Sequence, residues 1–121
     1  MSLTIAEPLQ RLPRFPELKT LAQQHNVQFN GDDSAGDFRH PDAEHPKVTG
    51  HYTVESQGDI HGDFTAHGMG KVAGTFAITE GKAEVTITEK PFLIPDALLK
   101  SSLSDALKEF CARFSNSSLN S

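Results

Sequence analysis

Apolar and polar residues alternate along the middle of the chain, in a pattern typical of antiparallel strands with one buried face. Four runs of inward positions follow one another: Val48, Gly50, Tyr52 and Val54; Ile60, Gly62, Phe64 and Ala66; Val72, Gly74, Phe76 and Ile78; Ala83, Val85 and Ile87. Successive side chains of a strand point to opposite faces. The period of two therefore predicts a sheet with one core face and one polar face.

In the first three of these runs a glycine is followed, two residues later, by an aromatic residue. The segments that start at Gly50, Gly62 and Gly74 recur every twelve residues, and Gly36-Asp37-Phe38 lies fourteen residues upstream of Gly50. Residues that share a face must pair across each hairpin, so the spacing predicts that Phe64 lies between Gly50 and Gly74. The same register places Tyr52 beside Gly36 and Gly62, Phe38 beside Gly50, and Phe76 beside Gly62.

Glycine inside a strand needs a compensating reason, because it costs about 0.5–1 kcal/mol relative to alanine. Aromatic cover and strong curvature of the sheet supply one. We therefore expect a curved, half-barrel meander of about five to six strands rather than a flat sheet. Two shorter runs, around Val27 and Phe29 and around Gly36 and Phe38, provide the first of these strands.

Two amphipathic helices are expected to cover this sheet. Pro16 suits a first helical position, and Leu18, Leu21, Ala22 and His25 then form a short apolar stripe. After Pro95 a longer helix carries Leu99, Leu103, Leu107, Phe110 and Phe114 on one side, which we expect to lie against the aromatic residues of the sheet. With residues 1–14 as an irregular arm and 115–121 as a frayed tail, the sequence predicts a single α+β domain over residues 1–121.

The amino-acid composition argues against some classes of binding partner and indicates the cellular compartment to expect. The 121 residues carry a net charge of −5 with only 11 Lys and Arg, which argues against a nucleic-acid partner. Cys111 is the only cysteine, so neither an intramolecular disulfide nor a thiolate zinc site is expected. We find no leader-like stretch and no transmembrane segment, and expect a cytoplasmic protein.

The polar face of the sheet offers one set of candidate chemistry. The predicted register puts His51 across from Asp63, with His61 and His67 on the same face. A catalytic site would use His51, His61 and Asp63, and a divalent metal site would add His67, with His40 and His45 of the His40–Pro46 loop as further ligands. The simpler interpretation, which we favour, is a solvated polar face. No hydrolase, phosphate-binding or cofactor motif is present, so no cofactor is expected.

The apolar face offers the other set. Tyr52, Phe64, Phe76 and Phe110 are candidate ligand-binding residues if a cavity lies between the sheet and the C-terminal helix, and are core residues if it does not. Phe92-Leu93-Ile94, between two prolines, either forms an exposed docking patch or closes the open end of the sheet, and we favour closure.

The order of elements over residues 16–114 resembles that of small bacterial polyhydroxyalkanoic acid system proteins. The likeness rests on the helix, the meander ending in Gly74-Thr75-Phe76 and Val85-Thr86-Ile87-Thr88, the Lys90–Pro95 segment and the closing helix. It implies an accessory protein of polyester storage granules, with no assigned active-site residues.

The leading hypothesis is thus a noncatalytic binding or accessory protein. Its curved sheet would bind an apolar small molecule, a hydrophobic surface or, through open strand edges, a second copy in a homodimer. The alternative is a small enzyme or metal-binding protein that uses the histidine-bearing face.

Overall fold

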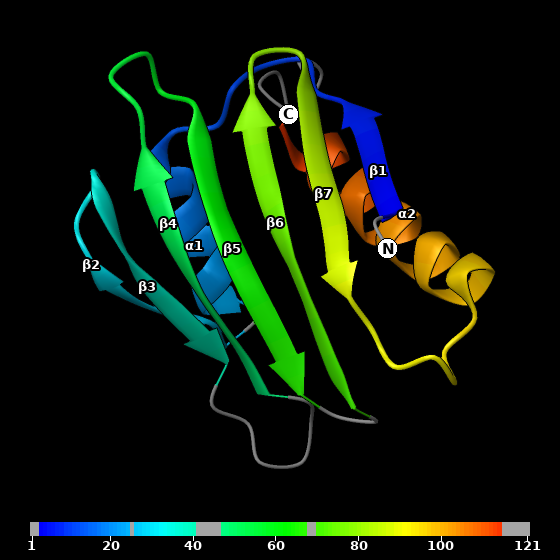
Figure 1. The fold of residues 1–121 in the computed structure, drawn as a ribbon. Helices are drawn as coiled ribbons and strands as arrows, with labels where there is room; N and C mark the ends of the chain where they lie inside the picture. Colours follow the sequence, from blue (N-terminus) through cyan, green and yellow to red (C-terminus); the bar gives the residue numbers. More distant parts are fainter. Residues whose placement is uncertain (1–2, 25, 41–46, 68–69, 115–121) are drawn as a thin grey trace.

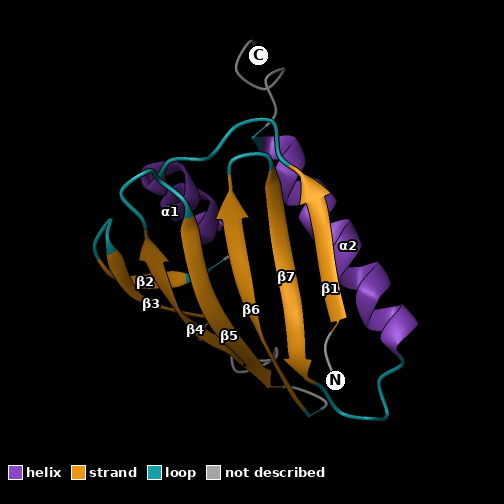
Figure 2. Cartoon of the chain, turned by 45° about the horizontal axis from the view of Figure 1, so that its top comes forward, coloured by secondary structure: helices purple, strands orange, loops and turns teal. Residues whose placement is uncertain are grey.

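The computed structural model describes residues 3–24, 26–40, 47–67 and 70–114. Its seven antiparallel strands form one sheet in the order β1-β7-β6-β5-β4-β3-β2. Their bounds are β1 (Leu3–Pro8), β2 (Gln28–Gly31), β3 (Ala35–His40), β4 (Lys47–Val54), β5 (Ile60–His67), β6 (Lys71–Thr79) and β7 (Lys82–Glu89). Helices α1 (Phe15–Gln24) and α2 (Asp96–Arg113) cover the same face of the sheet (Figures 1 and 2).

This arrangement confirms the predicted α+β class, with a curved but unclosed antiparallel meander, a short N-terminal helix and a longer C-terminal helix. The predicted register is also confirmed across the middle of the sheet. Phe64 pairs with Gly50 on β4 and with Gly74 on β6, and Tyr52 pairs with Gly36 and Gly62. A two-residue turn at Glu80-Gly81 then joins β6 to β7, so that Phe76 lies opposite Val85.

The prediction of an irregular arm over residues 1–14 is wrong for Leu3–Pro8, which forms the seventh strand. β1 pairs with β7 along its whole length, and Ile5 lies opposite Val85 with only 5% of its surface exposed. Pro8 is tolerated because it is the last residue of a strand at the edge of the sheet, where a missing N–H group breaks no ladder between two neighbours. The sequence prediction missed this strand because Pro8 and Pro13 favoured an irregular segment over the alternation of Leu3, Ile5 and Glu7.

The expectation that α2 lies against the aromatic residues is also wrong. α2 packs mainly on β1, and to a lesser extent on β7. The reason is the additional strand, which extends the sheet and supplies apolar partners for the helix. The buried cluster there consists of Leu9, Ala83, Cys111 and Phe114.

The guanidinium group of Arg11 connects the segment between β1 and α1 with the end of α2 through noncovalent contacts. Arg11 donates two hydrogen bonds to the carboxylate of Glu17, at 2.9 and 2.6 Å, and stacks over the ring of Phe114 at 5.4 Å from its centroid. The pKa of Glu17 is lowered to about 2, first by the Arg11 hydrogen bonds and then by the backbone N–H of Arg14. α1 is therefore fixed at its N-terminal end, beside the rim of the core.

The Phe92–Ile94 segment does not close the end of the sheet. Phe92 is 89% exposed and Leu93 is 78% exposed. The Nζ atom of Lys90, a side chain only 8% exposed, donates to the carbonyl of Ile94 at 2.6 Å and lies 2.9 Å from Oδ1 of Asp96. These contacts of the ammonium group hold the turn between β7 and α2 with Phe92 and Leu93 directed to solvent. The predicted tail 115–121 lies outside the described residues.

Candidate functional site

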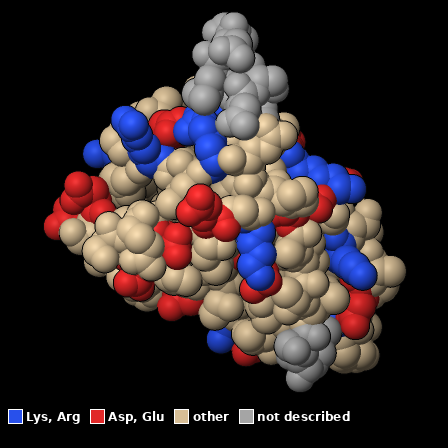
Figure 3. All heavy atoms as spheres, turned by 90° about the horizontal axis from the view of Figure 1, so that it is seen from above, with Lys and Arg blue, Asp and Glu red and all other residues tan. Residues whose placement is uncertain are grey.

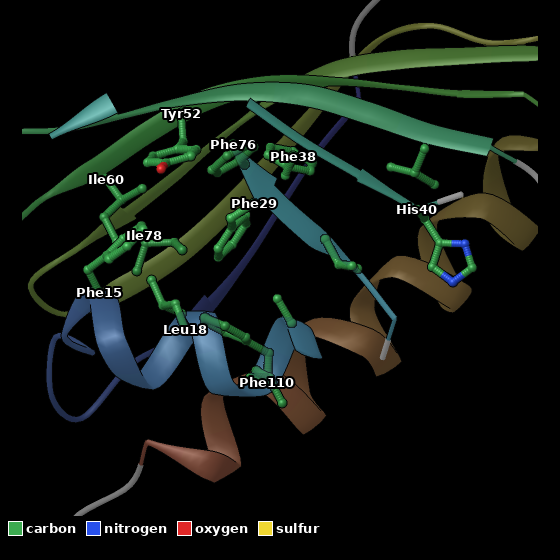
Figure 4. Close-up of a pocket in the computed structure, with 14 residues that line it drawn as sticks. Phe15, Leu18, Phe29, Phe38, His40, Tyr52, Ile60, Phe76, Ile78 and Phe110 are labelled. Atoms are coloured by element: carbon green, nitrogen blue, oxygen red, sulfur yellow. The ribbon is translucent and has the colours of Figure 1, made fainter. Parts of the chain in front are cut away.

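An apolar cavity of about 360 Å³ lies between the inner face of the sheet, β2 and α1 (Figure 4). Its walls come from seven elements, of which α2 contributes only Phe110. The lining residues are Phe15, Leu18, Leu21, Ala22, Val27, Phe29, Phe38, His40, Val48, Tyr52, Ile60, Phe76, Ile78 and Phe110. Of these, only His40 and Tyr52 carry a polar side-chain atom.

Stacked aromatic rings form one wall of the cavity. The rings of Phe15, Phe29 and Tyr52 contact one another in a triangle: the centroid of Tyr52 is 5.4 Å from each of the other two, which are 5.7 Å apart. Phe29 contacts Phe38 edge-on, with ring centroids 6.2 Å apart, and the centroids of Phe38 and Phe76 are 5.9 Å apart. These separations lie in the range of favourable aromatic pairs. The rings therefore support one another, and the wall exists without a ligand.

The cavity exists because the two helices divide the inner face unequally. α2, with 18 residues, packs on the β1 and β7 end, whereas α1 has only 10 residues to cover the rest. Glycines on the strands further lower the volume of side chain on this face. At Gly50 and Gly62 the space of a Cβ atom is taken by the ring edges of Phe38 and Phe76, so these rings contact the backbone of the neighbouring strand. The remaining space is the cavity.

The hydroxyl group of Tyr52 is directed away from the cavity's centre and already has a partner. It donates a hydrogen bond of 2.6 Å to the carbonyl oxygen of Asp32, in the turn between β2 and β3. Burial, followed by the charges of Asp32, Asp33 and Asp37, raises the pKa of this phenol. Tyr52 is thus a buried aromatic wall residue that also fixes the β2–β3 turn.

Three of the four predicted ligand-binding residues line the cavity: Tyr52, Phe76 and Phe110. Phe64 does not, because its ring lies against Gly74 on β6 and is half-buried there. Alternation identified its face correctly, but alternation does not say which part of a face a helix leaves open.

Sequence reasoning missed Phe15, Phe29 and His40 as lining residues. Phe15 precedes Leu18 and Ala22 at helical spacing, so extending the apolar stripe by one turn would have found it. His40 follows Gly36 and Phe38 at a spacing of two, which places it on the inner face of β3. It was instead assigned to the proline-containing loop, where histidines are usually exposed. His25 and His45 lie outside the described residues.

On the outer face, His51 lies between two carboxylates in a row across three strands. Its Nδ1 atom is 3.1 Å from Oδ1 of Asp63 on β5, which confirms the predicted pairing, and its Nε2 atom is 3.3 Å from Oδ1 of Asp37 on β3. The hydrogen bond to Asp63 is the main reason why the pKa of His51 is raised, followed by the charges of Asp37 and Asp63. The imidazole is 71% exposed.

The other histidines of this face are not brought to His51. His61 lies opposite Thr53 and Ala77, and His67 lies opposite Lys47 and Lys71 in the register. Over residues 3–24, 26–40, 47–67 and 70–114, no three His, Cys, Asp or Glu side chains lie close enough together to hold a metal ion. The row of Asp37, His51 and Asp63 is therefore a cross-strand ion cluster in which both imidazole nitrogens face a carboxylate.

Charge and hydropathy add two observations. On the side of the molecule seen in Figure 3, Lys and Arg side chains are interspersed with Asp and Glu, without a continuous basic surface. Neither helix in the described part of the chain is long and apolar enough to span a membrane.

No protein-family model, curated protein or solved structure matches this chain.

Proposed function

We propose that this protein is a noncatalytic binding protein that holds an apolar small molecule in the cavity under the curved sheet. One observation carries the proposal: a cavity of about 360 Å³ lined almost entirely by aliphatic and aromatic side chains. Small-molecule sites typically have volumes of about 300–1,000 Å³ and walls of this kind. A protein without a ligand would gain stability by filling such a space with larger side chains.

The outer face supports a catalytic or metal-dependent role less well. A general base needs a free nitrogen within hydrogen-bond reach of its substrate. In His51 both ring nitrogens face carboxylates, and the raised pKa favours the protonated form, which has no lone pair to accept a proton. The accessory role on polyester granules and the cytoplasmic location follow only from the sequence, and the binding of an apolar ligand does not depend on them.

Binding of the neutral fluorescent probe N-phenylnaphthylamine tests the proposal, because its emission rises when it leaves water for an apolar site. We expect saturable binding to the wild type. Ala22 lines the cavity from α1, so Ala22→Phe should abolish the rise and the smaller Ala22→Leu should reduce it. Ala106→Phe, which makes the same change at an exposed position of α2, is the matched control.

Thermal unfolding of each variant shows whether the fold is retained. Loss of probe binding in Ala22→Phe with an unchanged melting temperature supports the cavity as the site. Equal probe binding by wild type, Ala22→Phe and Ala22→Leu would overturn the proposal, as would a wild type that binds no probe.

A further inference from the structure

Tyr52, one of the two polar side chains of the lining, keeps its polar atom out of the cavity. Its hydroxyl group donates to the carbonyl oxygen of Asp32 at 2.6 Å. A Cβ atom built at Gly36 would come within 2.7 Å of the hydroxyl oxygen, and one built at Gly31 within 3.1 Å. These two glycines therefore give the hydroxyl group its place against the β2–β3 hairpin, while the ring forms part of the cavity wall.

His40, the other polar side chain, offers no hydrogen-bonding atom to the interior either. Its Nδ1 atom has almost no accessible surface, so a molecule in the cavity cannot reach it. Figure 4 shows the imidazole apart from the aromatic wall. Taken together, the lining residues expose almost no polar surface to the cavity, whether from side chains or from the main chain.

Water does not supply the missing polarity. A buried water molecule needs about two to four polar partners, and cavities lined by aliphatic and aromatic side chains stay dry for this reason. A ligand inside this cavity would thus find neither a protein group nor a bound water molecule with which to form a hydrogen bond.

From this closure of both polar side chains we infer that the cavity selects hydrocarbons over their hydroxylated derivatives. This inference rests on the proposed function, because it names the ligand class of the same cavity. Most small-molecule sites combine apolar walls with a few polar groups that orient the ligand. Here shape and dispersion contacts alone hold it, and a hydroxyl group brought inside would lose its hydrogen bonds to water without gaining others.

Two naphthalenes of the same shape test the inference: 1,5-dimethylnaphthalene and 1,5-dihydroxynaphthalene. Their substituents lie on opposite sides of the ring system, so at least one of them is inside the cavity in any bound orientation. Each compound displaces bound N-phenylnaphthylamine, whose single N–H group is a weak donor shielded by its two aryl groups. For the wild type we expect the hydrocarbon to bind at least about tenfold more tightly than the diol.

Val27→Thr adds a hydroxyl group to the lining at nearly constant shape, so it should bind the diol more tightly and narrow this preference. Val85→Thr is the matched control, because it makes the same change on β7, which contributes none of the lining residues, and it should keep the wild-type preference. Melting temperatures of both variants show whether the fold is retained.

A smaller preference in the wild type, or an unchanged preference in Val27→Thr, would overturn this inference and leave the apolar cavity as proposed. If the wild type binds no N-phenylnaphthylamine, the proposed function fails and this inference fails with it.

Discussion

Gly62 shows at the scale of one residue why the strands carry glycines. A Cβ atom built there would overlap the carbonyl oxygen of His51 and the ring edge of Phe76. The backbone φ of Gly62 is ordinary, so the requirement is for space and not for an unusual conformation. Gly50 and Gly62 each let a ring from a neighbouring strand, Phe38 and Phe76 respectively, lie against the backbone, and both rings line the cavity.

Replacing Gly62 with alanine should destabilise the protein by about 2 kcal/mol, because overpacking of a filled site costs about 1–3 kcal/mol. Urea unfolding followed by circular dichroism measures the change. In the double variant with Phe76→Leu the loss of unfolding free energy should be smaller than the sum of the two single losses, because leucine leaves space for the added methyl group. Thr53→Ala, on the exposed outer face, should change stability by less than about 0.5 kcal/mol. Additive losses in the double variant would contradict this account of the glycine.

The elements were predictable where alternation determined them. Strands β2 to β7, their register and both helices follow from apolar spacing, because a one-residue slip would turn every core side chain to solvent. The position of α2 did not follow, since β1 was hidden by Pro8 and only the extra strand gives that helix its partners. Predicting the cavity would have required knowing both that β1 exists and where α2 packs. Tyr52 and Phe76 were assigned to the correct face, but the space beside them depends on which part of that face each helix covers.

The row of Asp37, His51 and Asp63 links three strands and should make the sheet's stability depend on pH. The pKa of His51 is raised above its ordinary value of 6.5, so the imidazolium stabilises the fold fully below about pH 6.5. This contribution is lost as the pH rises through the raised value. His51→Gln should therefore cost most in mildly acidic buffer, and its deficit should shrink toward alkaline pH.

Unfolding midpoints in urea, measured for wild type and His51→Gln from about pH 5 to about pH 9, test this dependence. In an Asp63→Asn background the same histidine substitution should have a smaller effect at acidic pH, because the nearer carboxylate is gone. A deficit that grows toward alkaline pH would show that the sign is wrong.

At the scale of the whole molecule, two apolar regions have different roles. The cluster beneath β1 and β7 holds the fold together, and Leu9 within it is only 4% exposed. Phe92 and Leu93, in contrast, lie on the surface although they belong to the most apolar run outside the strands. Sequence could not separate these cases, because the direction of the turn depends on the ammonium group of Lys90.

Leu93→Glu should leave the free energy of unfolding within about 0.5 kcal/mol of the wild type, as expected for an exposed position. It should also weaken retention on a phenyl resin, and native mass spectrometry of both forms would report whether any homodimer depends on this surface. Leu9→Glu, the same change in the buried cluster, should abolish cooperative unfolding. A Leu93→Glu variant that melts like Leu9→Glu would contradict the exposed placement.

The glycine spacing also makes a pair of adjacent strands into a removable unit. Gly50 and Gly74 open equivalent segments 24 residues apart, on strands that run in the same direction. Joining Thr49 directly to Gly74 would place Phe76 where Tyr52 stands and keep a glycine opposite Phe38. Duplication or loss of such a hairpin in a gene would widen or narrow the sheet by two strands without reversing any face. The width of the inner face, and with it the space beneath the curved sheet, could thus change by two strands in a single genetic step.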